Sequence, residues 1–295
     1  MATALIGAAV FDGNRLRDGQ AVVIADGRIR AVVAEADLKP EIEKQPVTGL
    51  LAPGFIDIQV NGGGGVLFNE RPSVEGIAAI RAAHRRFGTT GFLPTLITDA
   101  QERMREAISA TQAALQAGTP GVLGIHLEGP FLNPERKGVH RADFMRPVEE
   151  ADLAMIELPM NGRVLVTLAP EKVEPSAIAR LAKAGVTIAA GHTKADVETI
   201  RRAQAAGLTG ITHLFNAMPP LISRDPGPVG AALDDKELWC GIIVDLHHVS
   251  IVALRVALAA RGPDRMILVT DAMPSVGSSE DTFDLLGERI RRVDG

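Results

Sequence analysis

The strongest constraint on the fold is a series of eight short apolar segments that alternate with stretches of helical character. The segments are residues 54–60, 90–96, 122–127, 164–168, 186–190, 210–214, 240–244 and 266–269. Short, continuously apolar segments are typical of parallel strands that are buried on both faces. Eight such strands alternating with helices predict an α/β fold, a closed TIM-like (β/α)8 barrel rather than an open sheet.

The stretches between the apolar segments carry helix start signals. Ser73 and Ser250 can each act as the N-cap of a helix, and Thr98 with Gln101 matches a capping-box pattern. Pro175 suits the first turn of a further helix. These signals place helices between the predicted strands, as a barrel requires.

Residues 1–50 have a different character. Asp12-Gly13 and Asp26-Gly27 are turn signals between short β-rich segments. We therefore expect three regions: a small β-rich domain at 1–50, the barrel without its last helix at 51–279, and a partial β-hairpin or linker at 280–295.

The composition excludes several classes of partner. The formal net charge is -5 and no long run of Lys or Arg occurs, so we expect no nucleic-acid partner. The single cysteine, Cys240, cannot form an internal disulfide and fits a reducing compartment. No apolar run approaches the roughly 20 residues that span a bilayer, and the N-terminus lacks a signal-peptide pattern. We expect a cytoplasmic protein that does not bind membranes.

Polar residues gather where the predicted strands end. Of seven histidines, five lie at or near the C-terminal end of a strand, His140 lies in the loop after the third strand, and only His84 lies on a helix. Because active sites of such barrels lie at the C-terminal ends of the strands, these side chains should meet at one mouth.

Glu128, His192 and His213 end the third, fifth and sixth strands. One carboxylate and two imidazoles suit a single divalent metal, with Zn²⁺ or Fe²⁺ favoured, and leave a position open for water. Asp271, after the eighth strand, is the candidate general base for hydrolysis of an amide. The structural alternatives are a buried pair of Glu128 with an arginine and a packing role for single histidines. For His126 we favour packing or support of the ligands from behind, and for His84 a place in the core.

Several motifs at these residues are similar to those of the N-acetylglucosamine-6-phosphate deacetylases, a branch of the amidohydrolase superfamily. The matching stretches are residues 53–57 (PGFID), 126–133 (HLEGPFLN), 137–140 (KGVH), 191–193 (GHT), 212–218 (THLFNAM) and 270–272 (TDA). HLEGPFLN and THLFNAM together are highly specific, whereas GHT or TDA alone would be weak.

The resemblance implies a hydrolase of amino-sugar metabolism that removes acetate from N-acetylglucosamine 6-phosphate, and it implies a homodimer. The epimer N-acetylgalactosamine 6-phosphate is the alternative substrate, because the motifs do not separate epimers. The implied roles are metal binding by Glu128, His192 and His213, catalysis by Asp271 and His140, and substrate binding by Asn216, Ala217, Arg224 and His248. Arg224 is implied to act across the dimer interface.

The sequence departs from the family at three places. Gln59 and Asn61 replace the His-x-His of the superfamily, which resembles the branch with one tightly held metal. Leu246 stands where the family usually has glycine. Family members also continue well beyond Gly295, and their extra segment supplies partner strands for residues 1–50 and the helix after the eighth strand. We therefore expect residues 1–295 alone to be less stable than a longer relative, and a non-catalytic fragment is the alternative function.

Overall fold

The structure, a computed structural model, describes residues 2–291. The chain divides into two compact units, Met1–Phe55 and Ile56–Gly295.

The first unit is built from strands. One sheet has the order β5-β4-β1-β6 and the other the order β3-β2-β7. Asp26 and Gly27 both have positive φ, 52° and 68°, which is the backbone that a tight two-residue hairpin turn requires. The strands are β1 (Ala2–Ile6), β2 (Ala9–Phe11), β3 (Leu16–Arg17), β4 (Gln20–Ala25), β5 (Arg28–Ala34), β6 (Glu43–Pro46) and β7 (Leu50–Leu51).

The second unit contains an eight-stranded parallel sheet in which neighbouring strands follow the order of the chain. Its strands are β8 (Phe55–Val60), β11 (Thr89–Ile97), β12 (Gly124–Glu128), β13 (Arg163–Leu168), β14 (Thr187–Ala190), β15 (Gly210–Ile211), β16 (Trp239–Ile243) and β17 (Met266–Val269). Each overlaps one of the eight apolar segments of the sequence. The TIM-like fold class is therefore confirmed.

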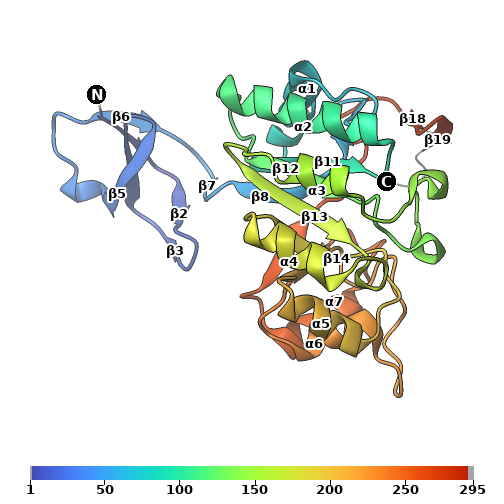
Figure 1. Cartoon of the computed structure of the whole chain (residues 1–295). Helices are drawn as coiled ribbons and strands as arrows, with labels where there is room; N and C mark the ends of the chain where they lie inside the picture. The colour runs from blue at the N-terminus through green and yellow to red at the C-terminus, as the bar shows by residue number, and fades with distance from the viewer. Residues whose placement is uncertain (1, 292–295) are drawn as a thin grey trace. The chain divides into compact units, whose positions relative to one another are not determined.

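Helices connect these strands and lie outside them (Figure 1). They are α1 (Val74–Arg85), α2 (Gln101–Gln116), α3 (Glu150–Ile156), α4 (Pro175–Lys183), α5 (Val197–Ala205), α6 (Gly227–Asp234) and α7 (Ile251–Arg261). Their apolar stripes, such as Ile77 and Ile80 of α1, are fully buried in the core. This burial stabilises the barrel by about 25 cal/mol per Å² of apolar surface removed from water.

Two of the three predicted helix caps are confirmed. Ser73 accepts a hydrogen bond from the backbone N–H of Gly76, and Ser250 accepts one from Ala253. The capping box at Thr98 is wrong, because α2 begins at Gln101 after Ala100 and has no side-chain cap. The Thr98 hydroxyl instead lies 2.9 Å from Nδ1 of His140 and is 3.3 Å from the carbonyl oxygen of Glu128.

The barrel closes between β8 and β17 through polar contacts and one isolated bridge. Val60 pairs with Ala272, and the buried carboxylate of Asp57 accepts a 2.6 Å hydrogen bond from the Thr270 hydroxyl. The backbone N–H of Asp271 donates to the carbonyl of Gln59 at 3.0 Å. This seam fixes the position of Asp271 relative to β8.

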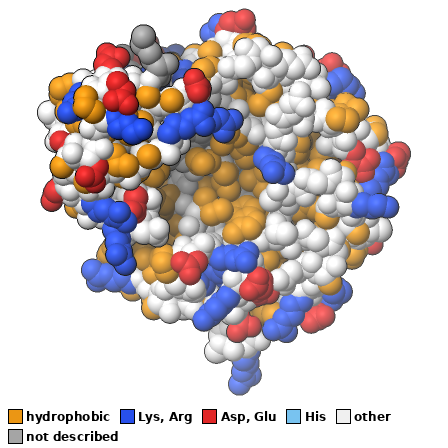
Figure 2. All heavy atoms as spheres, turned by 90° about the vertical axis from the view of Figure 1, so that its left-hand side faces the viewer, with side chains coloured by type: hydrophobic (Ala, Val, Ile, Leu, Met, Phe, Trp, Pro, Cys, Tyr) orange, Lys and Arg blue, Asp and Glu red, His pale blue; other side chains and the backbone are white. Residues whose placement is uncertain are grey.

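Two small hairpins lie beyond the sheet: β9 (Gly62–Gly63) with β10 (Val66–Leu67), and β18 (Thr282–Leu285) with β19 (Glu288–Arg291). The chain passes from β17 to β18 without a helix, and Leu268 on β17 is 56% exposed. Figure 2 shows hydrophobic side chains gathered in continuous areas on one face of the molecule.

Within residues 2–291, none of the helices is long and apolar enough to cross a membrane.

Candidate active site

Residues of the predicted site have an unusual backbone. His192, His213 and Asp271 are each the second residue after a strand, β14, β15 and β17 respectively, and have positive φ values of 49°, 31° and 50°. Non-glycine residues rarely adopt this left-handed region, and such strain gathers at functional sites. The turn after each strand therefore directs a polar side chain into the barrel mouth.

Glu128, at the end of β12, is the centre of the cluster. Its Oε1 atom lies 3.1 Å from Nε2 of His192 and 3.0 Å from Nε2 of His213, and these two nitrogens are 3.0 Å apart. All three side chains are buried. Burial acts to raise the pKa of Glu128, but the contacts with His192 and His213 outweigh it and hold that pKa well below its usual value.

Hydrogen-bond partners determine the tautomers of His192 and His140, and so which ring nitrogen carries the proton. Nδ1 of His192 lies 2.8 Å from the carbonyl oxygen of Arg136, which can only accept, so Nδ1 carries the proton. Its Nε2 then presents a lone pair to Glu128. In His140, Nδ1 accepts from the backbone N–H of Thr98 at 3.2 Å, so the proton of the neutral ring lies on Nε2.

This donor set fits a divalent metal. Two imidazole nitrogens and a carboxylate oxygen converge within about 3 Å, an arrangement that a cation bound between them would stabilise. Glu128, His140 and His192 also lie close enough to share an ion. However, Nε2 of His140 is 4.0 Å from Glu128 and carries a proton, so His213 completes the set better than His140 does. Burial lowers the pKa of His140 to about 3, which keeps its ring neutral.

Asp271 lies beside this cluster and is held by two amides. Asn61 Nδ2 donates to its Oδ1 at 2.6 Å, and Gln59 Nε2 donates to the same atom at 3.1 Å and to Glu128 at 3.0 Å. Within residues 2–291 no hydrogen bond reaches Oδ2, which leaves that atom available to water. Burial, and then repulsion from Glu128, raise the pKa of Asp271.

A cavity of about 700 Å³ contains this cluster and most of the predicted substrate-binding residues. That volume is in the range of small-molecule sites. Asn216, Ala217 and His248 line it, and His248 Nδ1 lies 2.6 Å from Oδ2 of Asp245. Arg224 lies on an exposed loop and does not line this cavity. The structure therefore brings all predicted site residues except Arg224 to one mouth.

The unusual Leu246 lies next to this mouth. Its φ is 66°, in the region that glycine adopts without a penalty and other residues adopt at a cost of roughly 1–2 kcal/mol. The turn at residues 245–248 keeps its hydrogen bonds to Asp245 despite this leucine. The departure from glycine is thus accommodated as local strain.

Three groups at the site were not predicted from the sequence: one contacts His140, and two line the cavity. Thr98 orients His140, whereas its sequence pattern indicated a helix cap. Phe283 and Ile290, from the β18–β19 hairpin, line the cavity although they lie in a segment without a motif. Alternation of apolar and polar residues in 282–285 was the only available signal.

Two family models match the chain. The model described as the NagA composite domain matches residues 3–51, and the model of the amidohydrolase family matches residues 50–278.

Curated relatives include both epimer specificities. An N-acetylgalactosamine-6-phosphate deacetylase of Shewanella sp. (strain ANA-3) is 40% identical over 97% of this chain and 73% of its own length. An N-acetylglucosamine-6-phosphate deacetylase of Haemophilus influenzae is 35% identical over 100% of this chain and 78% of its own length.

Solved structures agree with these matches. N-acetylglucosamine-6-phosphate deacetylase from Pasteurella multocida superimposes with a TM-score of 0.95 at 33% identity, over 100% of this chain and 78% of that chain. A mutant of the Mycobacterium smegmatis enzyme, in complex with N-acetyl-D-glucosamine-6-phosphate, gives a TM-score of 0.88 at 34% identity, over 100% and 76%. On the family match over most of its length, this chain belongs to the amidohydrolase family.

Proposed function

We propose that this chain hydrolyses N-acetylglucosamine 6-phosphate to glucosamine 6-phosphate and acetate. The observation that carries the proposal is the convergence of Glu128, His192, His213 and Asp271 in one cavity of substrate size. A relative in complex with this substrate and a relative named for this activity support the choice of substrate.

Glu128, His192 and His213 would hold one divalent ion, Zn²⁺ or Fe²⁺. When bound, such an ion supplies Lewis-acid polarisation of the amide carbonyl and acidifies water. The amides of Gln59 and Asn61 direct N–H groups at Asp271, and an N–H group cannot ligate a metal. This orientation supports a site for one ion rather than two.

Asp271 and His140 would move and hold the protons. Oδ2 of Asp271 takes a proton from the attacking water and returns it to the leaving nitrogen, while Gln59 and Asn61 hold Oδ1. The raised pKa of Asp271 makes its carboxylate a stronger base than a free aspartate, which favours the first of these steps. The Nε2–H of His140 donates a hydrogen bond to the carbonyl oxygen of the substrate's amide. Its Nδ1 cannot do so, because it accepts from the backbone N–H of Thr98.

Asn216, the backbone of Ala217, His248 and Arg224 would bind the sugar phosphate. Arg224 is exposed and lies outside the cavity of its own chain. We propose that it reaches the phosphate in the site of a second subunit, which makes the active form a homodimer. The buried free thiol of Cys240 fits the reducing environment of the cytoplasm.

Arg224→Ala and His248→Ala should mainly weaken binding of the phosphate. A hydrogen bond to a charged group contributes about 1.5–3 kcal/mol, which corresponds to a loss of roughly 10–150-fold in kcat/KM. Steady-state kinetics on N-acetylglucosamine with and without the 6-phosphate measure this effect, with Lys236→Ala as the control for loss of an exposed cation. Equal losses on both substrates would show that these residues serve the chemistry or the fold.

The epimer N-acetylgalactosamine 6-phosphate is the second candidate substrate, because the Shewanella relative is named for it. The experiment that tests the proposal is acetate release from both epimers by the same zinc-loaded preparation. We expect the larger kcat/KM for the gluco epimer. A larger value for the galacto epimer would reassign the substrate, and no release from either would remove the proposed activity.

A further inference from the structure

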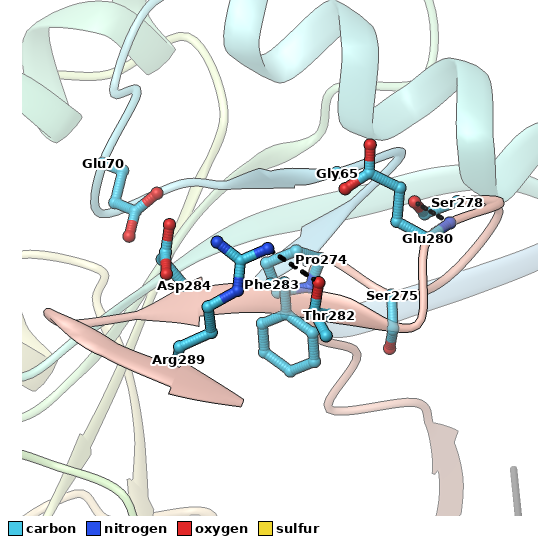
Figure 3. Close-up of a pocket in the computed structure, with 10 residues that line it drawn as sticks. All are labelled: Gly65, Glu70, Pro274, Ser275, Ser278, Glu280, Thr282, Phe283, Asp284 and Arg289. Atoms are coloured by element: carbon cyan, nitrogen blue, oxygen red, sulfur yellow. Dashed lines mark hydrogen bonds between the residues drawn. The ribbon is translucent and has the colours of Figure 1, made fainter. Parts of the chain in front are cut away.

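The β18–β19 hairpin presents two chemically different faces. Phe283 pairs with Ile290, and Asp284 pairs with Arg289. Because side chains alternate between the faces of a strand, the first pair and the second pair point in opposite directions. Figure 3 shows the polar side, where Glu70, Asp284 and Arg289 surround a second cavity and Arg289 donates to the Thr282 hydroxyl at 3.0 Å.

The apolar face is docked against the barrel mouth. Leu285 is buried with Leu67 and Ile97 in a small hydrophobic cluster, and Met273, Phe283, Leu286 and Ile290 pack against that cluster. The hairpin lines the active-site cavity with three apolar residues, Phe283, Leu285 and Ile290, and with Arg291 at the end of β19. Phe283 also reaches the polar cavity of Figure 3. The hairpin is therefore a wall of the site and not a distant appendage.

This wall borders the amide end of the cavity. Met273 follows Asp271 by two residues, and Ile97 directly precedes Thr98, which orients His140. The phosphate-binding candidates Asn216 and His248 instead come from the loops after β15 and β16. The part of an N-acyl substrate nearest the wall is thus its acyl group, which is also its apolar part.

We propose that the apolar face of the hairpin is the acyl-binding wall and sets the longest acyl chain that the enzyme accepts. This inference rests on the proposed deacetylase function and adds its acyl specificity. Apolar pockets discriminate by roughly 10–200-fold for each methylene that does not fit. Phe283 and Ile290 would exclude chains longer than acetyl by occupying the space that extra methylenes need.

The test compares N-acetyl, N-propionyl and N-butyryl glucosamine 6-phosphate as substrates of the zinc-loaded protein. The parent should prefer acetyl, and Ile290→Ala should raise the butyryl-to-acetyl ratio of kcat/KM by about 10-fold or more. Phe283→Ala should act in the same direction. Arg289→Ala, which truncates the opposite face of the same hairpin, should leave the ratio unchanged.

Each outcome decides the inference. If Ile290→Ala lowers kcat/KM for all three substrates by the same factor, the hairpin only supports the fold and the acyl-wall proposal is wrong. Ile290→Val keeps most of the packing, so its propionyl-to-acetyl ratio gives the answer if the alanine variant fails to melt cooperatively. A parent that hydrolyses none of the three substrates would instead overturn the proposed function, and the inference would fall with it.

Discussion

Asp271→Asn is expected to lower kcat by about 10²–10⁴-fold, the usual scale of general acid–base catalysis. The asparagine side chain has the same shape, and its oxygen can still accept from Asn61 and Gln59. Only the basic atom that faces water is lost, because an amide nitrogen cannot take a proton. Steady-state kinetics together with metal analysis of the variant measure the effect.

Metal content and KM serve as the controls for this variant, since neither should change greatly if the geometry is retained. A near-parental kcat in a fully metal-loaded variant would show that another group is the base. Loss of metal along with activity would show that Asp271 is itself a ligand.

The second large effect is expected from the imidazoles. Loss of a group that only hydrogen-bonds a metal ligand lowers metal affinity by roughly 10–100-fold. His213→Ala removes a proposed ligand itself, so metal affinity should fall by more than this, and activity should fall with metal content. The reason is that His213 Nε2 is one of only three converging donors proposed for the ion. Metal retained after dialysis against a chelator, measured by elemental analysis, reports the change.

His247→Ala is the matched control, because this exposed histidine lies near the mouth but does not line the cavity. It should keep metal and activity at the parental level. If His213→Ala retained a full equivalent of metal while His140→Ala lost it, the alternative cluster of Glu128, His140 and His192 would be the metal site.

The barrel and the cluster at its mouth could be predicted from the sequence because both depend on local patterns. Apolar segments mark the strands, and the residue after each strand must lie at the same end of a parallel sheet. Glu128, His192 and His213 could therefore be placed together although they are far apart in the chain. The strained turn that holds His213 shortened β15 to Gly210–Ile211, which an apolar pattern over 210–214 does not indicate.

The contacts that could not be predicted from the sequence join residues far apart in the chain, so a local pattern around one residue does not indicate the other. Thr98 carries a helix-capping signal in the sequence. In the structure its hydroxyl instead contacts the ring of His140, which is 42 residues away. The seam from Asp57 to Thr270 joins residues 213 positions apart. The wall formed by Phe283 and Ile290 arises only when the hairpin packs on Leu67 and Ile97, so no local pattern assigns it to the site.

The most direct test of the account is a metal titration of the metal-free protein, with acetate release from N-acetylglucosamine 6-phosphate as the readout. The arrangement of Glu128, His192 and His213, with Gln59 and Asn61 turned to Asp271, predicts that activity rises linearly with Zn²⁺ and stops rising at one equivalent per chain. A rise that continues to two equivalents, or no acetate release at any metal content, would contradict the account.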